Sequence, residues 1–210
     1  MLVRKILNLL PEIDRLSNRY LVMRHGHSIA NAQGIIVSHP ENGCFGFGLS
    51  ELGRSQVEQS LQQETLLGVD TMIVCSDFMR ARESAEIAHS LLDCANPIAV
   101  EPRLRERNFG ELELSADKAY ADVWREDMAN PDSCWRGVES VNQVMRRVTA
   151  VINELENRHA NAVLLLVSHG DALQILQTAF ARRAASDHRE LEHLHTAEIR
   201  QLDLSLPDLP

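Results

Sequence analysis

Two apolar segments that lie far apart in the chain each end in a histidine followed by a glycine. Residues 20–26 read YLVMRHG, and residues 162–170 read AVLLLVSHG. A short apolar run that stops at polar and turn residues is typical of a buried strand. Ligands of open α/β sheets bind beyond the carboxyl ends of parallel strands. We therefore expect His25 and His169 to meet at one edge of a sheet.

Strand and helix signals alternate along the chain around these two segments. The expected strands are 20–23, 71–76, 98–100, 162–167 and 197–204, and the expected helices are 50–67, 79–92, 118–128, 140–158 and 170–180. Alternation of this kind favours a mainly parallel sheet with right-handed crossovers and helices on both faces. The predicted fold class is α/β, a three-layer α/β/α sandwich with a mainly parallel central sheet.

Outside this core, two further parts of the chain have their own patterns. Apolar residues recur at helical spacing in residues 1–18, which predicts an amphipathic helical segment and makes it the first candidate for a homodimer contact. Residues 19–210 are expected to form the α/β domain, with a helical insertion at about 112–140. The loop at 34–48 and this insertion are expected to line the mouth of a pocket.

The overall composition excludes several kinds of partner. With a formal net charge of -9, the chain lacks the basic surface that binds nucleic acid or an anionic membrane. No apolar run approaches the roughly 20 residues needed to cross a bilayer. The four cysteines form no C-x-x-C pair, so neither a zinc site nor a disulfide framework is indicated. We expect a reduced, cytoplasmic protein.

Arg24 and His25 are suited to bind and attack a phosphate group. Arginine presents a planar, permanently charged fork to phosphate oxygens, and a neutral imidazole nitrogen can attack phosphorus near neutral pH. Gly26 allows the backbone to turn sharply after them. A histidine after a strand can equally be a hydrogen-bonded structural residue. Both interpretations remain open for His25, and His169 could likewise be a core histidine.

Arg80 and Glu106 are further candidates with structural alternatives. Arg80 follows the expected strand 71–76 in the first turn of a helix, where a cation opposes the helix dipole by about 0.3–1 kcal/mol. A surface cation would avoid that position, whereas a phosphate ligand tolerates it. Glu106 is either a general acid or part of a solvated ion pair with the arginines on either side. Glu111 and Glu113 are alternatives for the acid.

Together these residues resemble the histidine phosphatase superfamily, the phosphoglycerate mutase-like proteins. The resemblance covers about residues 20–180 and implies the phosphoglycerate mutase-like fold. It rests on five blocks in the family's order and a weaker sixth. They are RHG at 24–26 with Ser28 and Asn31, LSELG at 49–53, SDFMRAR at 76–82 with Ser84 and Ala85, LRE at 104–106 before FGE at 109–111, SHG at 168–170, and more weakly Gly137, Glu139 and Ser140.

The resemblance implies a role for each site residue. His25 matches the nucleophile, which forms a phosphohistidine that water then hydrolyses. Glu106 matches the general acid that protonates the leaving oxygen. A transferring phosphoryl group spreads negative charge over three oxygens, so catalysis needs charge stabilisation. The residues implied to bind the substrate are Arg24, Asn31, Arg80, His169 and Gly170, of which Arg24, Arg80 and His169 also count as catalytic.

No metal or cofactor is expected under this interpretation. Metal-dependent phosphatases hold paired ions with clustered carboxylates and histidines, and His25 and His169 have other roles here. His188, His193 and His195 form a weak alternative metal cluster. We favour a solvated helix end or a pocket rim for these three.

The expected activity is hydrolysis of a phosphomonoester on a small phosphorylated metabolite. The resemblance implies that mutases of the family are longer chains with a larger insertion after the acid, whereas in this chain the stretch from Glu106 to His169 is short. A smaller lid leaves a phosphoenzyme open to water. Phosphoglycerate mutase-type transfer is the first alternative. The second is a catalytically silent protein that binds a phosphorylated ligand.

Two features depart from the family pattern. Many members read Gly-Glu-Trp-Glu-Gly where residues 110–114 of this chain read GELEL. His27 occupies a position that is often acidic in mutases. Both changes concern the pocket rim more than the phosphate site, so they leave the identity of the substrate open.

Overall fold

The computed structural model describes Leu10 and residues 15–204 of the 210-residue chain. The helix predicted for residues 1–18 therefore lies mostly outside the described residues, and its last part, 15–18, is not helical. Within the described ranges, no helix is both long enough and apolar enough to cross a membrane.

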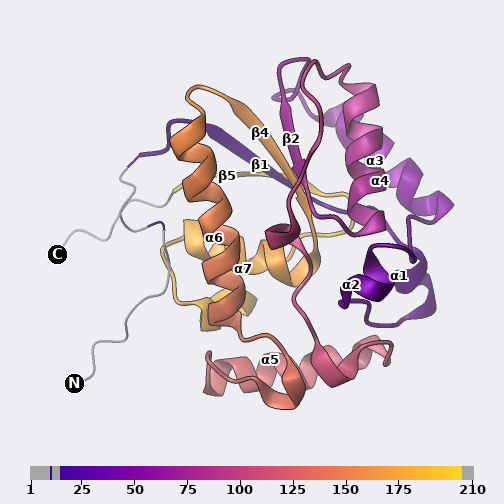
Figure 1. The fold of residues 1–210 in the computed structure, drawn as a ribbon, viewed down its shortest axis with the longest axis vertical. Helices are drawn as coiled ribbons and strands as arrows, with labels where there is room; N and C mark the ends of the chain where they lie inside the picture. The colour runs from indigo at the N-terminus through magenta and orange to yellow at the C-terminus, as the bar shows by residue number, and fades with distance from the viewer. Residues whose placement is uncertain (1–9, 11–14, 205–210) are drawn as a thin grey trace.

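Five strands form one central sheet in the order β3-β2-β4-β1-β5 (Figure 1). The antiparallel pairing is that of β5 with β1, and the other pairings are parallel. In register, Arg24 pairs with Ser168 and Cys75 pairs with Val167, so β1, β2 and β4 end side by side. The strands are β1 (Arg19–Arg24), β2 (Met72–Cys75), β3 (Ala99–Val100), β4 (Val163–Ser168) and β5 (Ile199–Leu202).

The helices follow the strands in the expected chain order. Among the predicted helices, the largest difference in bounds is at α3, which ends at Gln63 instead of residue 67, and the short helices α1 and α2 were not predicted. The side-chain oxygens of Ser50 and Ser140 begin α3 and α6 because each accepts a hydrogen bond from the backbone N–H three residues on. The α-helices are α1 (Ile29–Gln33), α2 (Pro40–Gly43), α3 (Glu51–Gln63), α4 (Met79–Leu91), α5 (Tyr120–Ala129), α6 (Val141–Arg158) and α7 (Gly170–Phe180), and the 3-10 turns are η1 (Pro102–Leu104), η2 (Gly110–Leu112), η3 (Asp117–Ala119), η4 (Trp135–Gly137) and η5 (Ala185–Glu190).

Alternate residues of the central strands pack against different helix layers. Tyr20 and Val22 belong to the core formed with α6 and α7. Leu21 and Met23 belong to a second core formed with α3 and α4. Successive side chains of a strand point to opposite faces of the sheet, so each helix pair covers one face. Figure 1 shows the two pairs on either side of the sheet, and the expected α/β/α sandwich is confirmed.

The segment at 112–140 carries α5, which lies apart from the helices that cover the sheet (Figure 1). Its apolar side chains Leu112, Val123 and Val138 pack with Ile36 and Phe109 in a third, smaller core. Ile36 lies in the loop after α1. The loop and the segment therefore share one buried cluster.

Candidate active site

His25 lies at the carboxyl end of β1, with only 3% of its surface exposed. Its Nδ1 is 2.7 Å from the carbonyl oxygen of Gly26, which can only accept, so Nδ1 carries the proton. The lone pair of Nε2 accepts a hydrogen bond from Nε of Arg80 across 3.0 Å. Burial, followed by the charges of Arg80 and Arg24, holds the pKa of His25 well below its usual value. The ring is therefore a neutral imidazole with a defined nucleophilic nitrogen.

Two arginines present unused donors beside this ring. Arg80 is buried in the first turn of α4, and its second terminal nitrogen, Nη2, donates to the carbonyl of Val37 across 2.9 Å. The Nη1 atom of Arg24 is 2.9 Å from both Nε2 of His193 and the carbonyl of Leu194. Among the described residues, Nη1 of Arg80 and Nε of Arg24 have no hydrogen-bond partner. Buried donors of this kind suit an anionic ligand.

His169 follows β4, and the centre of its ring is 5.1 Å from that of His25. Its Nε2 is 2.9 Å from Oγ of Ser76, while its buried Nδ1 has no partner among the described residues. Phe78 packs edge-on at 5.1 Å. Burial is also the main cause that lowers the pKa of His169 well below its usual value. The structure thus brings together the two rings that the two His-Gly segments carry.

Glu106 is held by backbone donors, and the solvated ion pair considered for it is not formed. Its Oε1 accepts hydrogen bonds from the N–H of Arg107 across 2.9 Å and of Ala172 across 3.2 Å. Arg105 instead pairs with Asp77, and the side chain of Arg107 pairs with Asp127. Burial and then the charge of Asp171 raise the pKa of Glu106, which favours its protonated form.

The alternatives for the acid have other contacts. Glu113 accepts hydrogen bonds from the backbone and side chain of Ser38 and from the side chain of Asn42. Glu111 is exposed and lies 3.2 Å from Arg136. Both carboxylates therefore have structural roles at the surface of the insertion, while Glu106 interacts electrostatically with Arg80.

Asn31 and Gly170 occupy different surroundings. Ser28 is the residue that caps the N-terminus of α1, and the side-chain oxygen of Asn31 accepts hydrogen bonds from the N–H and the hydroxyl of Ser28. Asn31 is exposed, and its oxygen is occupied in this conformation. Gly170 begins α7, where an added Cβ would lie 3.5 Å from Cζ of Arg24. That separation is an ordinary van der Waals contact, so the guanidinium of Arg24 lies against the start of the helix.

The family assignment follows from comparison with known proteins. The model of the histidine phosphatase superfamily (branch 1) matches residues 20–206. The chain belongs to this superfamily. A probable phosphoglycerate mutase GpmB from Erwinia tasmaniensis is 31% identical over 189 residues, which cover 88% of this chain and 83% of that protein. The protein of the same name from Cronobacter sakazakii is 32% identical over the same coverage.

Solved structures show the same fold in proteins named as phosphatases. A mycobacterial glucosyl-3-phosphoglycerate phosphatase in complex with VO3 is 25% identical, with a TM-score of 0.69 over 87% of this chain and 90% of that one. The α-ribazole phosphatase from Shigella flexneri is 24% identical, with a TM-score of 0.66 over 87% and 89%. Of the four proteins described above, the two sequence relatives are thus named as mutases and the two solved structures as phosphatases.

The structure shows the surroundings of the residues that depart from the superfamily pattern. Leu112 is buried in the small core with Phe109 and Val123, where a shorter apolar side chain replaces the usual tryptophan. Leu114 has a φ of 60°, a conformation that favours glycine, which is the residue many members carry there. His27 is not free at the entrance, because its Nδ1 is 2.9 Å from Oγ of Ser50 at the start of α3.

The C-terminal histidines do not behave as one solvated group. His188 is fully buried, so the expectation of a solvated helix end is wrong for this residue. His193 contacts Arg24, and burial lowers its pKa to about 4. In the described part of the chain, no group of three His, Cys, Asp or Glu side chains could hold a metal ion. The sequence analysis named His193 only as a weak metal ligand or as part of a helix end or pocket rim, and it missed the contact with Arg24 because no local pattern connects the two residues.

The sequence analysis also missed Tyr120. Tyr120, the first residue of α5, packs against Phe109 and stacks on Trp124 at 5.6 Å. Burial raises the pKa of Tyr120, and the neighbouring charges include Glu106 and Arg80. Tyr120 of the insertion thus lies near charged residues of the candidate site. An apolar pattern could place it on a helix, but only the packing of α5 brings it to the site.

Proposed function

We propose that this chain is a phosphomonoester hydrolase that acts through a phosphohistidine intermediate on a small phosphorylated metabolite. The observation that carries the proposal is the state of His25. Its Nδ1 proton is held by the carbonyl of Gly26, so Nε2 has the free lone pair, which accepts a hydrogen bond from Nε of Arg80, and Nη1 of the same arginine has no partner among the described residues. A neutral imidazole surrounded by cationic donors is suited to attack a phosphate dianion.

The proposed reaction has two displacement steps. In the first, Nε2 of His25 attacks phosphorus, the bond to the leaving oxygen breaks, and the Glu106 carboxyl gives its proton to that oxygen. In the second, Glu106 takes a proton from water, the water oxygen attacks phosphorus, and the P–N bond breaks to release inorganic phosphate. Arg24, Arg80 and His169 stabilise the charge on the equatorial oxygens in both steps.

Mutase-type phosphoryl transfer is the second candidate because of the names of the sequence relatives. Two relatives at 31% and 32% identity are named probable phosphoglycerate mutases. Hydrolysis remains the first choice because the insertion after Glu106 is small, with α5 as its longest helix. A small cover gives water access to a phosphoenzyme. The solved relative at 25% identity is named a phosphatase of a phosphoglycerate derivative.

The test uses labelled phosphodonors and purified protein. We expect release of phosphate from p-nitrophenyl phosphate and an acid-labile label on the protein, both lost in His25→Ala. His159→Ala is the matched control, because this histidine lies at the far end of α6 and should leave both signals in place. Faster isomerisation of a phosphoglycerate than hydrolysis of any monoester would establish a mutase. Binding of phosphate without a covalent label would establish a silent binding protein.

A further inference from the structure

The two backbone donors that hold Glu106 belong to chain segments fixed by one buried cluster of charges. One donor is the N–H of Arg107, whose side chain is at the centre of the cluster. The other is the N–H of Ala172, which follows Asp171, a second member of the cluster. The cluster therefore determines where the carboxyl group of Glu106 lies.

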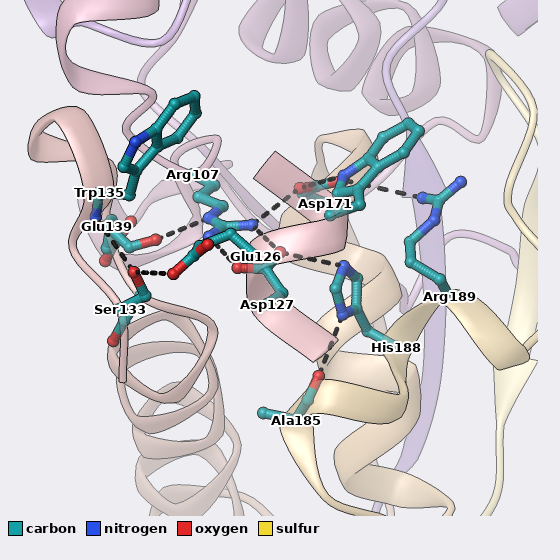
Figure 2. Close-up of polar contacts among 12 residues, drawn as sticks. Arg107, Glu126, Asp127, Ser133, Trp135, Glu139, Asp171, Ala185, His188 and Arg189 are labelled. Carbon is teal, nitrogen blue, oxygen red and sulfur yellow. Dashed lines mark hydrogen bonds and ion pairs between the residues drawn. The ribbon is translucent and has the colours of Figure 1, made fainter. Parts of the chain in front are cut away.

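Arg107 and Asp127 form the neutral part of this cluster. Their side chains are 1% and 2% exposed. The two terminal nitrogens of Arg107 donate to the two carboxylate oxygens of Asp127 across 2.6 and 2.7 Å. Figure 2 shows the Arg107 guanidinium between the carboxylates of Asp127 and Asp171. A bidentate pair of this geometry is a strong, charge-assisted contact, and Arg107 lies closer to Asp127 than to Asp171.

Asp171 is less completely neutralised. Its side chain is 5% exposed, and its nearest oxygen is 3.5 Å from Nη1 of Arg107. Nη1 of Arg189, a partly exposed residue, lies 3.9 Å away. The indole N–H of Trp124 donates to both carboxylate oxygens across 3.1 and 3.3 Å. A buried carboxylate with cations at these longer distances keeps part of its field, which acts strongly in a medium of low dielectric constant.

Charged groups from several elements act on Glu106. Burial is the largest cause that raises its pKa, and Asp171 of α7 is the second. The N–H of Arg107, Arg80 of α4 and Arg24 of β1 act in the opposite direction. Tyr120 of α5 faces the same carboxyl and is neutral because burial raises its own pKa. Of the three charged side chains that act most strongly, Asp171 is thus the one that favours the protonated acid.

We propose that Asp171 is a positioning residue that keeps Glu106 protonated until the leaving-group oxygen takes its proton. The proposal rests on the function above, in which Glu106 is the general acid. Asp171 acts through its charge and by fixing the start of α7, and it does not touch the substrate. Arg107, Arg189 and the indole N–H of Trp124 face Asp171 and keep it ionised, and His188, whose own pKa is lowered by burial, adds a charge only when it is protonated. After the first step, the same charge favours return of a proton from water to Glu106.

The test is the pH dependence of kcat/KM in Asp171→Asn. Asparagine keeps the size of the side chain and an oxygen that can accept from Trp124. We expect the limb at high pH, where Glu106 loses its proton, to move to lower pH. Glycerol 2-phosphate needs a proton on its leaving oxygen, whereas p-nitrophenolate leaves without one. Near neutral pH, the rate with glycerol 2-phosphate divided by the rate with p-nitrophenyl phosphate should fall about tenfold for each pH unit that the limb moves.

Asp127→Asn separates this effect from a structural one. Asp127 packs in the same cluster but is absent from the main causes that act on Glu106. The Asp127→Asn substitution should lower the melting temperature without moving the high-pH limb. Equal movement in both variants, or a stationary limb in Asp171→Asn, would overturn the proposal. If Asp171→Asn does not fold, Arg189→Gln serves instead. It removes a cation beside Asp171 and should move the limb to higher pH, and no movement there would also overturn the proposal.

A direct titration keeps the inference distinguishable from the proposed function. The ¹³C signal of the Glu106 carboxyl, assigned with Glu106→Gln, reports its protonation without turnover. It should titrate at lower pH in Asp171→Asn than in the unmodified chain. If the unmodified chain hydrolyses no phosphomonoester, the proposed function fails while this titration still decides the coupling. An unchanged Glu106 titration in an active protein refutes the role of Asp171 alone.

Discussion

Nε of Arg80 donates a hydrogen bond to Nε2 of His25 across 3.0 Å, at the lone pair from which the imidazole would attack phosphorus. The free protein therefore keeps its candidate nucleophile occupied by its own arginine. An entering phosphate has to take that donor for one of its oxygens, which frees Nε2 at the same moment. The arginine thus holds the ring in the neutral form and can then bind the anion.

Arg80→Lys tests whether the planar fork of this side chain is needed. Lysine keeps the charge but cannot contact His25, the carbonyl of Val37 and a phosphate oxygen together. We expect kcat/KM for p-nitrophenyl phosphate to fall by about 10²–10³, similar to the loss of one transition-state donor. Arg82→Lys, at an exposed position two residues further along α4, is the matched control. Retention of most activity in Arg80→Lys would contradict this role.

Ser76→Ala tests the tautomer of His169. Oγ of Ser76 accepts from the N–H of Phe78 across 3.3 Å, so its proton is available for Nε2 of His169. Nδ1 of His169 then carries the proton and can donate to phosphate. Without the hydroxyl, the tautomers become closer in energy, and we expect about a tenfold loss in kcat/KM. NMR of the ring nitrogens should show the change, and an unaltered tautomer in the variant would refute the explanation.

The pH profile of kcat/KM should be bell-shaped, with its optimum on the acidic side of neutrality. The low limb reports protonation of His25, whose pKa is depressed by burial and by two arginines, so the nucleophile stays neutral well below pH 6.5. The high limb reports loss of the Glu106 proton, whose pKa is raised by burial and by Asp171. Steady-state assays of an alkyl phosphate from pH 4 to 9 measure both limbs. Glu106→Gln should remove the high limb, and its persistence would assign it to another group.

Gly53→Ala should disturb the turn that follows His25. An added Cβ at Gly53 would lie 2.0 Å from the carbonyl oxygen of His27, where the first loop crosses the start of α3. Overpacking against backbone is relieved by moving one of the two segments, so we expect a loss of about 3 kcal/mol in unfolding free energy. Urea titration measures it. Gly68→Ala is the control, since nothing lies within 4 Å of its added Cβ. Equal stability of the two variants would refute the close approach.

The sequence predicted the elements best where a pattern is local. The apolar run before His25 became β1, and the run before His169 became β4, because burial of adjacent apolar side chains requires no knowledge of distant residues. The beginning of α7 at Gly170 was also visible, since an apolar strand ended there. Strand boundaries were less certain because β5 spans only Ile199–Leu202, and its pairing with β1 decides where it ends.

The surroundings of the charged residues could not be predicted in the same way. The sequence that flanks Arg107 does not reveal whether its side chain is solvated or buried. Only the approach of α5 and α7 provides Asp127 and Asp171 as its partners. His193 was grouped with its neighbours along the chain, although its contact is with Arg24, 169 residues away. The cost of burying a charge depends on such partners, and no periodicity records them.

By itself, therefore, the sequence predicted that two strands would each deliver a histidine to the same sheet edge, because the His-Gly ends are local signals and the alternation of strands and helices favours parallel pairing. The tertiary structure alone decided which side chains surround the site residues and which protonation state those surroundings favour. Burial of His25 beside Arg80 lowers the pKa of the ring and favours its neutral form, and burial of Glu106 beside Asp171 raises the pKa of the carboxyl and favours its protonated form. Desolvation and Coulomb interaction depend on distances between segments, which exist only once the chain is folded.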